Sequence, residues 1–197
     1  MNKKIRVRVQ ETSRIYIHNN LSNTGYYFRQ RIEKRLKEDD REGIGLEMMA
    51  CLTMMAFAIE ARINFLGFRL INGWDEWLPI KKKVKLVSKH LGISADFGKR
   101  PYETVKLLKE FRDTLAHGKP VTFTDDREII TTHDELEKRG YLNADWESYV
   151  NIEFIRQAAA DSDEIWRDLL KLADLNLFET LTQGDRSVQF IEHIEEA

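Results

Sequence analysis

The sequence holds one cysteine, three prolines and ten glycines among its 197 residues. Cys51 stands alone in the apolar run MMACLTMM, which excludes an intrachain disulfide and a cysteine-based zinc site and favours a buried structural thiol. Scarce proline and glycine argue against long loops and linkers. The net charge of −2 excludes a polybasic nucleic-acid binder as a description of the whole chain, but it leaves room for a local basic patch.

Neither a secretory signal nor a membrane span is indicated by the pattern of apolar residues. The N-terminus MNKKIRVRVQ is basic but lacks the apolar segment of a signal peptide. The longest apolar run, residues 48–59, is interrupted by Thr53 and is followed by Glu60 and Arg62, so it falls short of the roughly 18 residues that cross a bilayer. We therefore expect a soluble cytoplasmic protein without membrane contact, in which this run forms a buried helix.

Apolar residues recur at helical spacing in several segments, and they make up much of a chain that is 42% hydrophobic and 32% charged. Residues 46–71 are apolar nearly all round, so this helix is expected at the centre. Proline near the first turn and glycine past the end mark the two helices that follow. The predicted helices cover about residues 26–37, 46–71, 79–91, 101–117 and 146–178, the last with a break near residues 161–162. This pattern predicts an all-α fold, an antiparallel bundle of four to five helices.

The flanking segments carry weaker signals. Strict alternation over residues 4–9, with Ile15 and Ile17 further on, predicts a short N-terminal β-hairpin. Residues 121–145 read as irregular, with a strand pair in VTFT and EIITT and a short helix over 134–139. We accordingly divide the chain into an N-terminal extension (1–44), a helical bundle (45–178) and a C-terminal tail (179–197).

The helix YETVKLLKEFRDTLAHGKP places an arginine inside its apolar stripe. Arg112 follows Leu108 by four residues and precedes Leu115 by three, and its other neighbours at helical spacing are Lys109 and Ala116. None of these is acidic. Because an unpaired guanidinium on an apolar face costs free energy, its partner is expected on another helix, in another subunit or in a ligand.

Glu60 and Asn64 interrupt the apolar central helix, and Asp113 and His117 follow Arg112 on its own helix. Glu60 and Asn64 are the natural candidates to meet Arg112 across the bundle. Asp113 precedes His117 by four residues and could orient its imidazole. Arg112 and His117 diverge by about 140° on an ideal helix, so they converge only if the helix end opens or a second copy contributes.

A purely structural interpretation competes with a catalytic one. A histidine at a helix C-terminus is often simply favourable with the helix dipole. An arginine in a stripe can pair with Glu60 and do nothing else, and on chemistry alone such a structural ion pair is the commoner outcome.

Basic runs elsewhere have a similar double interpretation. Lys81, Lys82 and Lys83 are typical of a solvated helix face, but beside a ribonuclease site they and Lys119 would hold phosphates. The histidines at 18, 90 and 133 are isolated, and neither a metal-ligand spacing nor a glycine-rich phosphate loop is present. We expect no metal and no cofactor.

The run RDTLAH, residues 112–117, resembles the R-x4-6-H motif of HEPN domains. FAIEARINFL resembles the first long core helix of that family, GWDEWLPIKKKVKLVSKHLG resembles its second helix, and LAHGK is typical of the end of the motif helix. The resemblance covers about residues 45–175. The tyrosine that follows the histidine by two residues in the longer form of the motif is replaced here by Lys119, which argues against the usual nucleotidyltransferase-paired toxin.

The resemblance implies a helical bundle that dimerises through the motif face and cleaves RNA without a metal. His117 would transfer protons at the 2′-hydroxyl or the leaving oxygen, Arg112 would stabilise the charge at phosphorus, and Asp113 would orient His117. The implied partners are RNA or a nucleotide, a second copy and an antitoxin or other protein, in a defence, toxin–antitoxin or stress role. The alternatives are a non-catalytic HEPN-like module that binds a nucleotide or a protein, and a helical dimer without a ligand.

Overall fold

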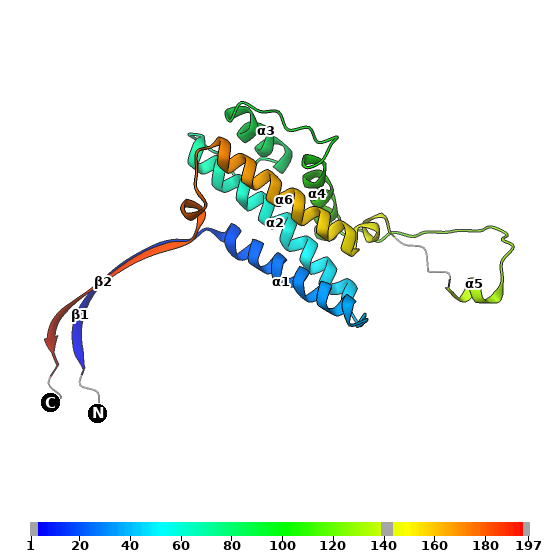
Figure 1. Cartoon of the computed structure of the whole chain (residues 1–197), viewed down its shortest axis with the longest axis horizontal. Coiled ribbons are helices and arrows are strands. Elements are labelled where there is room, and N and C mark those ends of the chain that lie inside the picture. Colours follow the sequence, from blue (N-terminus) through cyan, green and yellow to red (C-terminus); the bar gives the residue numbers. More distant parts are fainter. Residues whose placement is uncertain (1–3, 139–143, 195–197) are drawn as a thin grey trace.

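The computed structural model describes residues 4–138 and 144–194 and is mostly helical (Figure 1). Five α-helices pack together, and α5 lies on a segment that extends away from them (Figure 1). Short 3-10 helices precede and follow α6. The helices are α1 (Ile17–Lys37), α2 (Ile44–Leu70), α3 (Ile80–His90), α4 (Tyr102–Ala116), α5 (His133–Lys138), η1 (Asp145–Tyr149), α6 (Ile152–Leu172) and η2 (Leu177–Thr180).

Helix α2 is the centre of the fold, as its sequence predicted. It contacts α1, α3, α4 and α6. Its buried residues, among them Leu52, Ile59 and Leu66, contribute to one core with residues from those four helices. By length and hydropathy alone α2 could also cross a membrane, yet Glu60 and Arg62 on it pair with residues of neighbouring helices.

Helix α1 begins at Ile17, about nine residues before the predicted start. The first turns of α1 are mostly polar and lack a clear helical pattern of apolar residues. Contacts with other helices, not a local signal, therefore stabilise this part of α1. The His18 ring lies against Phe65 and Trp166, with ring centroids 5.0 and 5.3 Å away. A Cβ on Gly25 would meet Met55 at 3.4 Å, so α1 approaches α2 closely there. Helix α1 therefore packs with the bundle although it lies in the segment we predicted as an extension.

The predicted N-terminal hairpin is wrong. Strand β1 (Ile5–Arg14) pairs in antiparallel fashion with β2 (Gln183–His193) from the other end of the chain. Alternation of apolar residues identifies a strand but not the strand with which it pairs. Ile17, which we placed in the second strand of the hairpin, is the first residue of α1. The two strands form a ribbon that projects from the bundle (Figure 1).

Hydrogen bonds at the start of α1 hold the segment before β2 close to the end of β1. The Tyr16 N–H donates to Thr182 Oγ1 at 3.0 Å, and Asn19 Nδ2 donates to the Thr180 carbonyl at 2.9 Å. These bonds bring η2 and the predicted C-terminal tail next to the N-terminal segment.

The region after α4 differs in part from its prediction. VTFT and EIITT form no strand pair, and the chain from Gly118 to Thr132 is irregular. The predicted short helix is present as α5, and residue 139 lies outside the described residues.

The last predicted helix, residues 146–178, corresponds to η1, α6 and η2, and α6 itself is unbroken. Asn151 caps α6 by accepting a hydrogen bond from the Phe154 N–H at 2.7 Å, which separates α6 from η1. Asp161 and Ser162, where we expected a break, are buried within α6. The Asp161 carboxylate binds Arg100 and Thr104 and therefore anchors the start of α4.

Candidate functional site

The Arg112 guanidinium lies between α4 and α2 and is paired with two carboxylates. Its Nη1 contacts Glu60 Oε2, and its Nε and Nη2 lie 3.1 and 2.9 Å from Asp113 Oδ1. It also lies 5.8 Å from the centroid of the Phe57 ring. Burial opposes the charge, yet the hydrogen bonds to Asp113 and Glu60 raise the pKa of Arg112 above its ordinary value. The predicted contact between Glu60 and Arg112 is thus confirmed.

Glu60 also joins a third helix to this cluster. Its Oε1 lies 2.7 Å from Lys83 Nζ of α3, while its other oxygen contacts Arg112. Burial alone would raise the pKa of Glu60, but the hydrogen bonds from Lys83 and Arg112 hold it below the ordinary glutamate value. One carboxylate therefore links α2, α3 and α4.

Lys83 was predicted as one of the lysines that bind phosphate, and this prediction is wrong. Its residue surface is 1% exposed and its ammonium group binds Glu60, so it does not face solvent. Position 83 faces α2 because it shares a helix face with Ile80 and Val87, both buried. Lys82 and Lys119 are exposed, and Lys81 lies with its Nζ 6.0 Å from the Phe97 ring centroid.

Asp113 does not orient His117 as predicted. Its carboxylate binds Lys109 and Arg112, and these contacts hold its pKa below the usual range although burial opposes this. The contact between Asp113 and His117 is a backbone hydrogen bond, His117 N–H to Asp113 O, at 2.9 Å. The sequence argument missed the Arg112–Asp113 pair because it considered only residues three and four positions from Arg112.

His117 ends α4 with its side chain exposed. Within the described parts of the chain, its ring has no hydrogen-bond partner. Its backbone bond to Asp113 keeps the last turn of α4 closed, so the helix end does not open to bring His117 toward Arg112. In one copy of the chain the two side chains leave α4 in different directions.

Of the two candidates to meet Arg112, Glu60 makes the contact and Asn64 is hydrogen-bonded elsewhere. Its Oδ1 accepts a hydrogen bond from Trp74 Nε1 at 3.3 Å. Trp74 lies on Gly67, where an added Cβ would come within 2.2 Å of the indole ring. Asn64 therefore ties α2 to the turn that leads toward α3.

The fold and this cluster define a helical-bundle protein with an arginine-centred ion-pair network near an exposed histidine. Among residues 4–138 and 144–194, no group of three or more histidine, cysteine, aspartate or glutamate side chains is arranged to hold a metal ion. Comparisons with protein-family models, curated proteins and solved structures found no match.

Proposed function

We propose that this protein is a metal-independent endoribonuclease of the HEPN type, acting as a homodimer in a defence, toxin–antitoxin or stress role. The observation that carries the proposal is the fixed position of Arg112 on α4, five residues before an exposed His117 at the end of the same helix. Arginine and histidine are the side chains that metal-free phosphodiester cleavage needs, one for charge and one for protons.

The charge around Arg112 suits a phosphate. Arg112, Lys83 and Lys109 supply three positive charges, and Glu60 and Asp113 supply two negative charges, which leaves a net charge of +1. Since Glu60 holds Arg112 from the α2 side, a scissile phosphate would replace Asp113 as the second partner. Arg112 would then stabilise the negative charge that builds up on the phosphate oxygens.

His117 would move protons in the same reaction. Its exposed ring can reach a 2′-hydroxyl or a leaving oxygen, and the requirement for the 2′-hydroxyl makes RNA the substrate. Because α4 holds Arg112 and His117 apart in one copy, the site is composite: Arg112 of one protomer acts with His117 of the other. Lys82 and Lys119 are the remaining exposed candidates to bind the RNA backbone.

An apolar stripe beside Arg112 supports dimerisation. Leu46, Phe57 and Phe68 are 72%, 40% and 65% exposed, and their spacing of eleven residues places them on one face of α2. Exposed apolar stripes of this kind are typical of protein interfaces. Arg112 lies over Phe57, so a second copy on this stripe would reach the Arg112 cluster.

The pairing of Arg112 also favours the alternative, a non-catalytic module of the same type that binds a nucleotide or a protein. Glu60 and Asp113 both pair with Arg112, and such pairing is typical of a structural ion-pair network. One experiment separates the two functions: purified protein is incubated with mixed RNA, with and without chelator, beside an Arg112→Ala, His117→Ala double variant. Cleavage by the wild type alone supports the enzyme, and binding without cleavage supports the module.

A further inference from the structure

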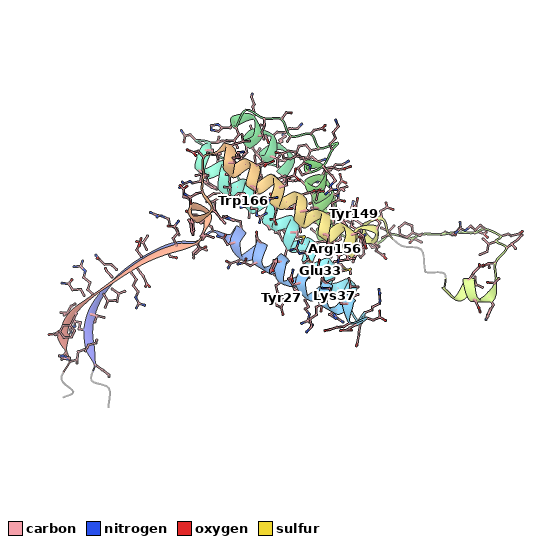
Figure 2. All side chains as sticks on the ribbon, in the orientation of Figure 1. Tyr27, Glu33, Lys37, Tyr149, Arg156 and Trp166 are labelled. Carbon is pink, nitrogen blue, oxygen red and sulfur yellow. The ribbon has the colours of Figure 1, made fainter. Side chains whose placement is uncertain are left out.

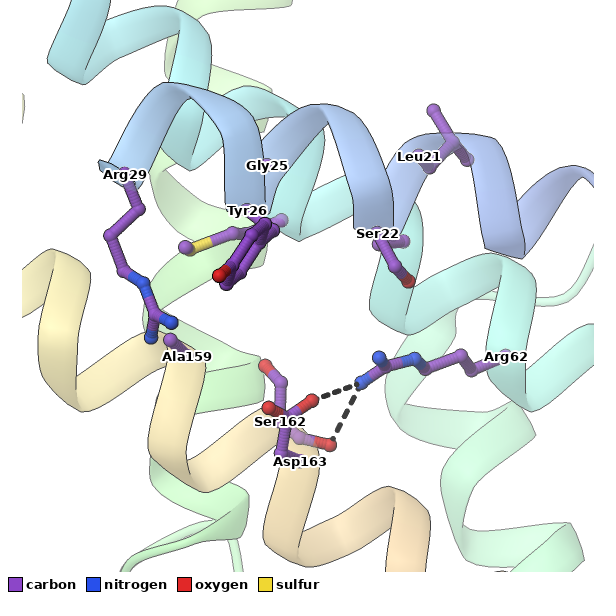
Figure 3. Close-up of a pocket in the computed structure, with 11 residues that line it drawn as sticks. Leu21, Ser22, Gly25, Tyr26, Arg29, Arg62, Ala159, Ser162 and Asp163 are labelled. Carbon is purple, nitrogen blue, oxygen red and sulfur yellow. Dashed lines mark hydrogen bonds and ion pairs between the residues drawn. The ribbon is translucent and has the colours of Figure 1, made fainter. Parts of the chain in front are cut away.

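A polar pocket lies between α1, α2 and α6 (Figure 3). Arg62 lines it and follows Glu60 by two residues, so the two side chains leave α2 about 200° apart, on opposite sides. Met55 and Ala58 of α2 form part of the lining, and the cavity volume is about 60 Å³. That is room for several waters or one small ion. The pocket is therefore separate from the Arg112 cluster.

The pocket presents hydrogen-bond donors without partners in the protein. The Nε atoms of Arg29 and Arg62 and the Oγ atom of Ser22 are buried and have no hydrogen-bond partner among the described residues. Arginine side chains only donate, and a buried donor without an acceptor costs free energy. Figure 3 shows the two arginine side chains entering from opposite sides, Arg29 from α1 and Arg62 from α2. These donors are therefore available to an acceptor that enters the pocket.

The local charge favours an anion as this acceptor. Arg62 donates through Nη1 to Asp163 Oδ1 at 3.1 Å and to the Ser162 carbonyl at 3.2 Å, which leaves its Nε unused. In the described chain Arg29 has no carboxylate partner, and its guanidinium lies 5.5 Å from the Tyr26 ring centroid. Two arginines against Asp163 leave one net positive charge at the pocket.

Neighbouring surface charges do not cancel this excess. Further along the seam between α1 and α6, Arg156 Nε pairs with Glu33 Oε1 at 3.2 Å, so that carboxylate is already occupied (Figure 2). Gly25 and Ala159 carry no side chains long enough to fill the pocket or to bind the arginines. The pocket is thus open and positively charged.

We propose that this pocket binds a phosphate group, either as inorganic phosphate or as the end of a small phosphomonoester. A tetrahedral phosphate offers acceptors in several directions and can bind Arg29 and Arg62 on opposite walls together with Ser22. A planar carboxylate has two oxygens and can satisfy only one wall with good geometry. This site does not depend on the proposed ribonuclease activity.

The test is calorimetric titration of the full-length protein, with amide chemical shifts to locate the ligand. The probes are inorganic phosphate, ribose 5-phosphate, adenosine 5′-monophosphate and acetate. Arg29→Gln is the test variant, because it breaks no hydrogen bond or ion pair within the described chain. Lys37→Gln is the matched control, since it removes the same charge from an exposed position on the same helix. Circular dichroism checks that both variants are folded.

Phosphate or a phosphomonoester is expected to bind wild type and Lys37→Gln equally, with shifts at Ser22 and Arg62. Arg29→Gln should bind about ten- to a hundredfold more weakly, the effect of losing a hydrogen bond to a charged group. Tighter binding of ribose 5-phosphate than of inorganic phosphate would assign the site to a monoester, and the reverse order would assign it to the free ion. Equal affinity in Arg29→Gln, equal binding of acetate, or no binding of any probe at millimolar concentration would overturn the proposal.

Discussion

The Nζ atom of Lys83 lies 2.7 Å from Oε1 of Glu60, and the lysine is almost fully buried between α3 and α2. This contact makes Glu60 the structural centre of the candidate site, because its other oxygen holds Arg112. A lysine withdrawn from water in this way depends on its carboxylate partner.

Replacing Glu60 by glutamine should therefore destabilise the fold strongly. The change leaves the buried Lys83 charge without compensation, and we expect the free energy of unfolding to fall by about 3 kcal/mol. Urea denaturation measures this. Glu33→Gln is the matched control, since Glu33 pairs with an arginine that is 57% exposed and should contribute much less. Equal losses in the two variants would mean that the Glu60 network is unimportant for stability.

His18 should give the protein a dependence of stability on pH. Burial, helped by the charge of Arg62, lowers the pKa of His18 from 6.5 to about 4. The unfolded chain then binds a proton at a higher pH than the folded chain does, so folding stability is full above pH 6.5 and declines as the pH falls toward 4. The decline should be on the order of 2–3 kcal/mol with allowance for screening by solvent.

The measurement is urea denaturation at several pH values between about 7 and 4, which span the ordinary and the lowered pKa of His18. His18→Leu should remove most of this decline in stability. His90→Leu is the control: His90 is exposed, so the decline should be the same as in the wild type. A decline of the same size in His18→Leu would assign the pH dependence to other groups.

The dimer predicted from the α2 stripe can be tested by light scattering. Wild-type protein is expected as a dimer at micromolar concentration, and Phe57→Gln should weaken the association because Phe57 lies at the centre of the stripe. Leu86→Gln on α3 is a fitting control, since Leu86 is 42% exposed and Phe57 40%. A wild-type protein that remains monomeric would rule out a composite site.

A composite site also predicts rescue between inactive variants. Arg112→Ala and His117→Ala each lack one of the two side chains, yet a mixed dimer holds one complete pair, Arg112 of one protomer and His117 of the other. Statistical exchange of protomers should restore about a quarter of the wild-type cleavage rate. RNA cleavage after the two variants are mixed and allowed to exchange measures this. A mixture as inactive as its components would contradict the assignment of the two side chains to opposite protomers.

The sequence predicted the parts of the fold that depend on local signals. The bounds of α3 and α4 follow from Pro79 and Pro101 before them, and Gly92 and Gly118 just beyond their ends. The contact between Glu60 and Arg112 was also predictable, because each is a charged residue on an otherwise apolar helix face.

What the sequence did not predict depends on tertiary contacts. Lys83 lies in a lysine-rich run, and only the packing of α3 on α2 shows that it is buried while Lys82 is exposed. The pairing of β1 with β2 joins the two ends of the chain, and no local pattern indicates so distant a partner. Asp113 was assigned to His117 by helical spacing, but its carboxylate binds Lys109 and Arg112 instead.

The most direct test of the proposed function is cleavage of RNA by His117→Ala beside the wild type and His90→Ala. His117 and His90 are both exposed histidines at the ends of helices, so the two variants differ mainly in their relation to Arg112. We predict that wild type and His90→Ala cleave RNA in the presence of EDTA, leave a 2′,3′-cyclic phosphate or its hydrolysis product, and spare DNA. His117→Ala should remain folded and lose activity by about 10²–10⁴-fold, the usual effect of removing a general acid or base. Cleavage by His117→Ala at the wild-type rate, or no cleavage of any RNA by the wild type, would contradict the assignment.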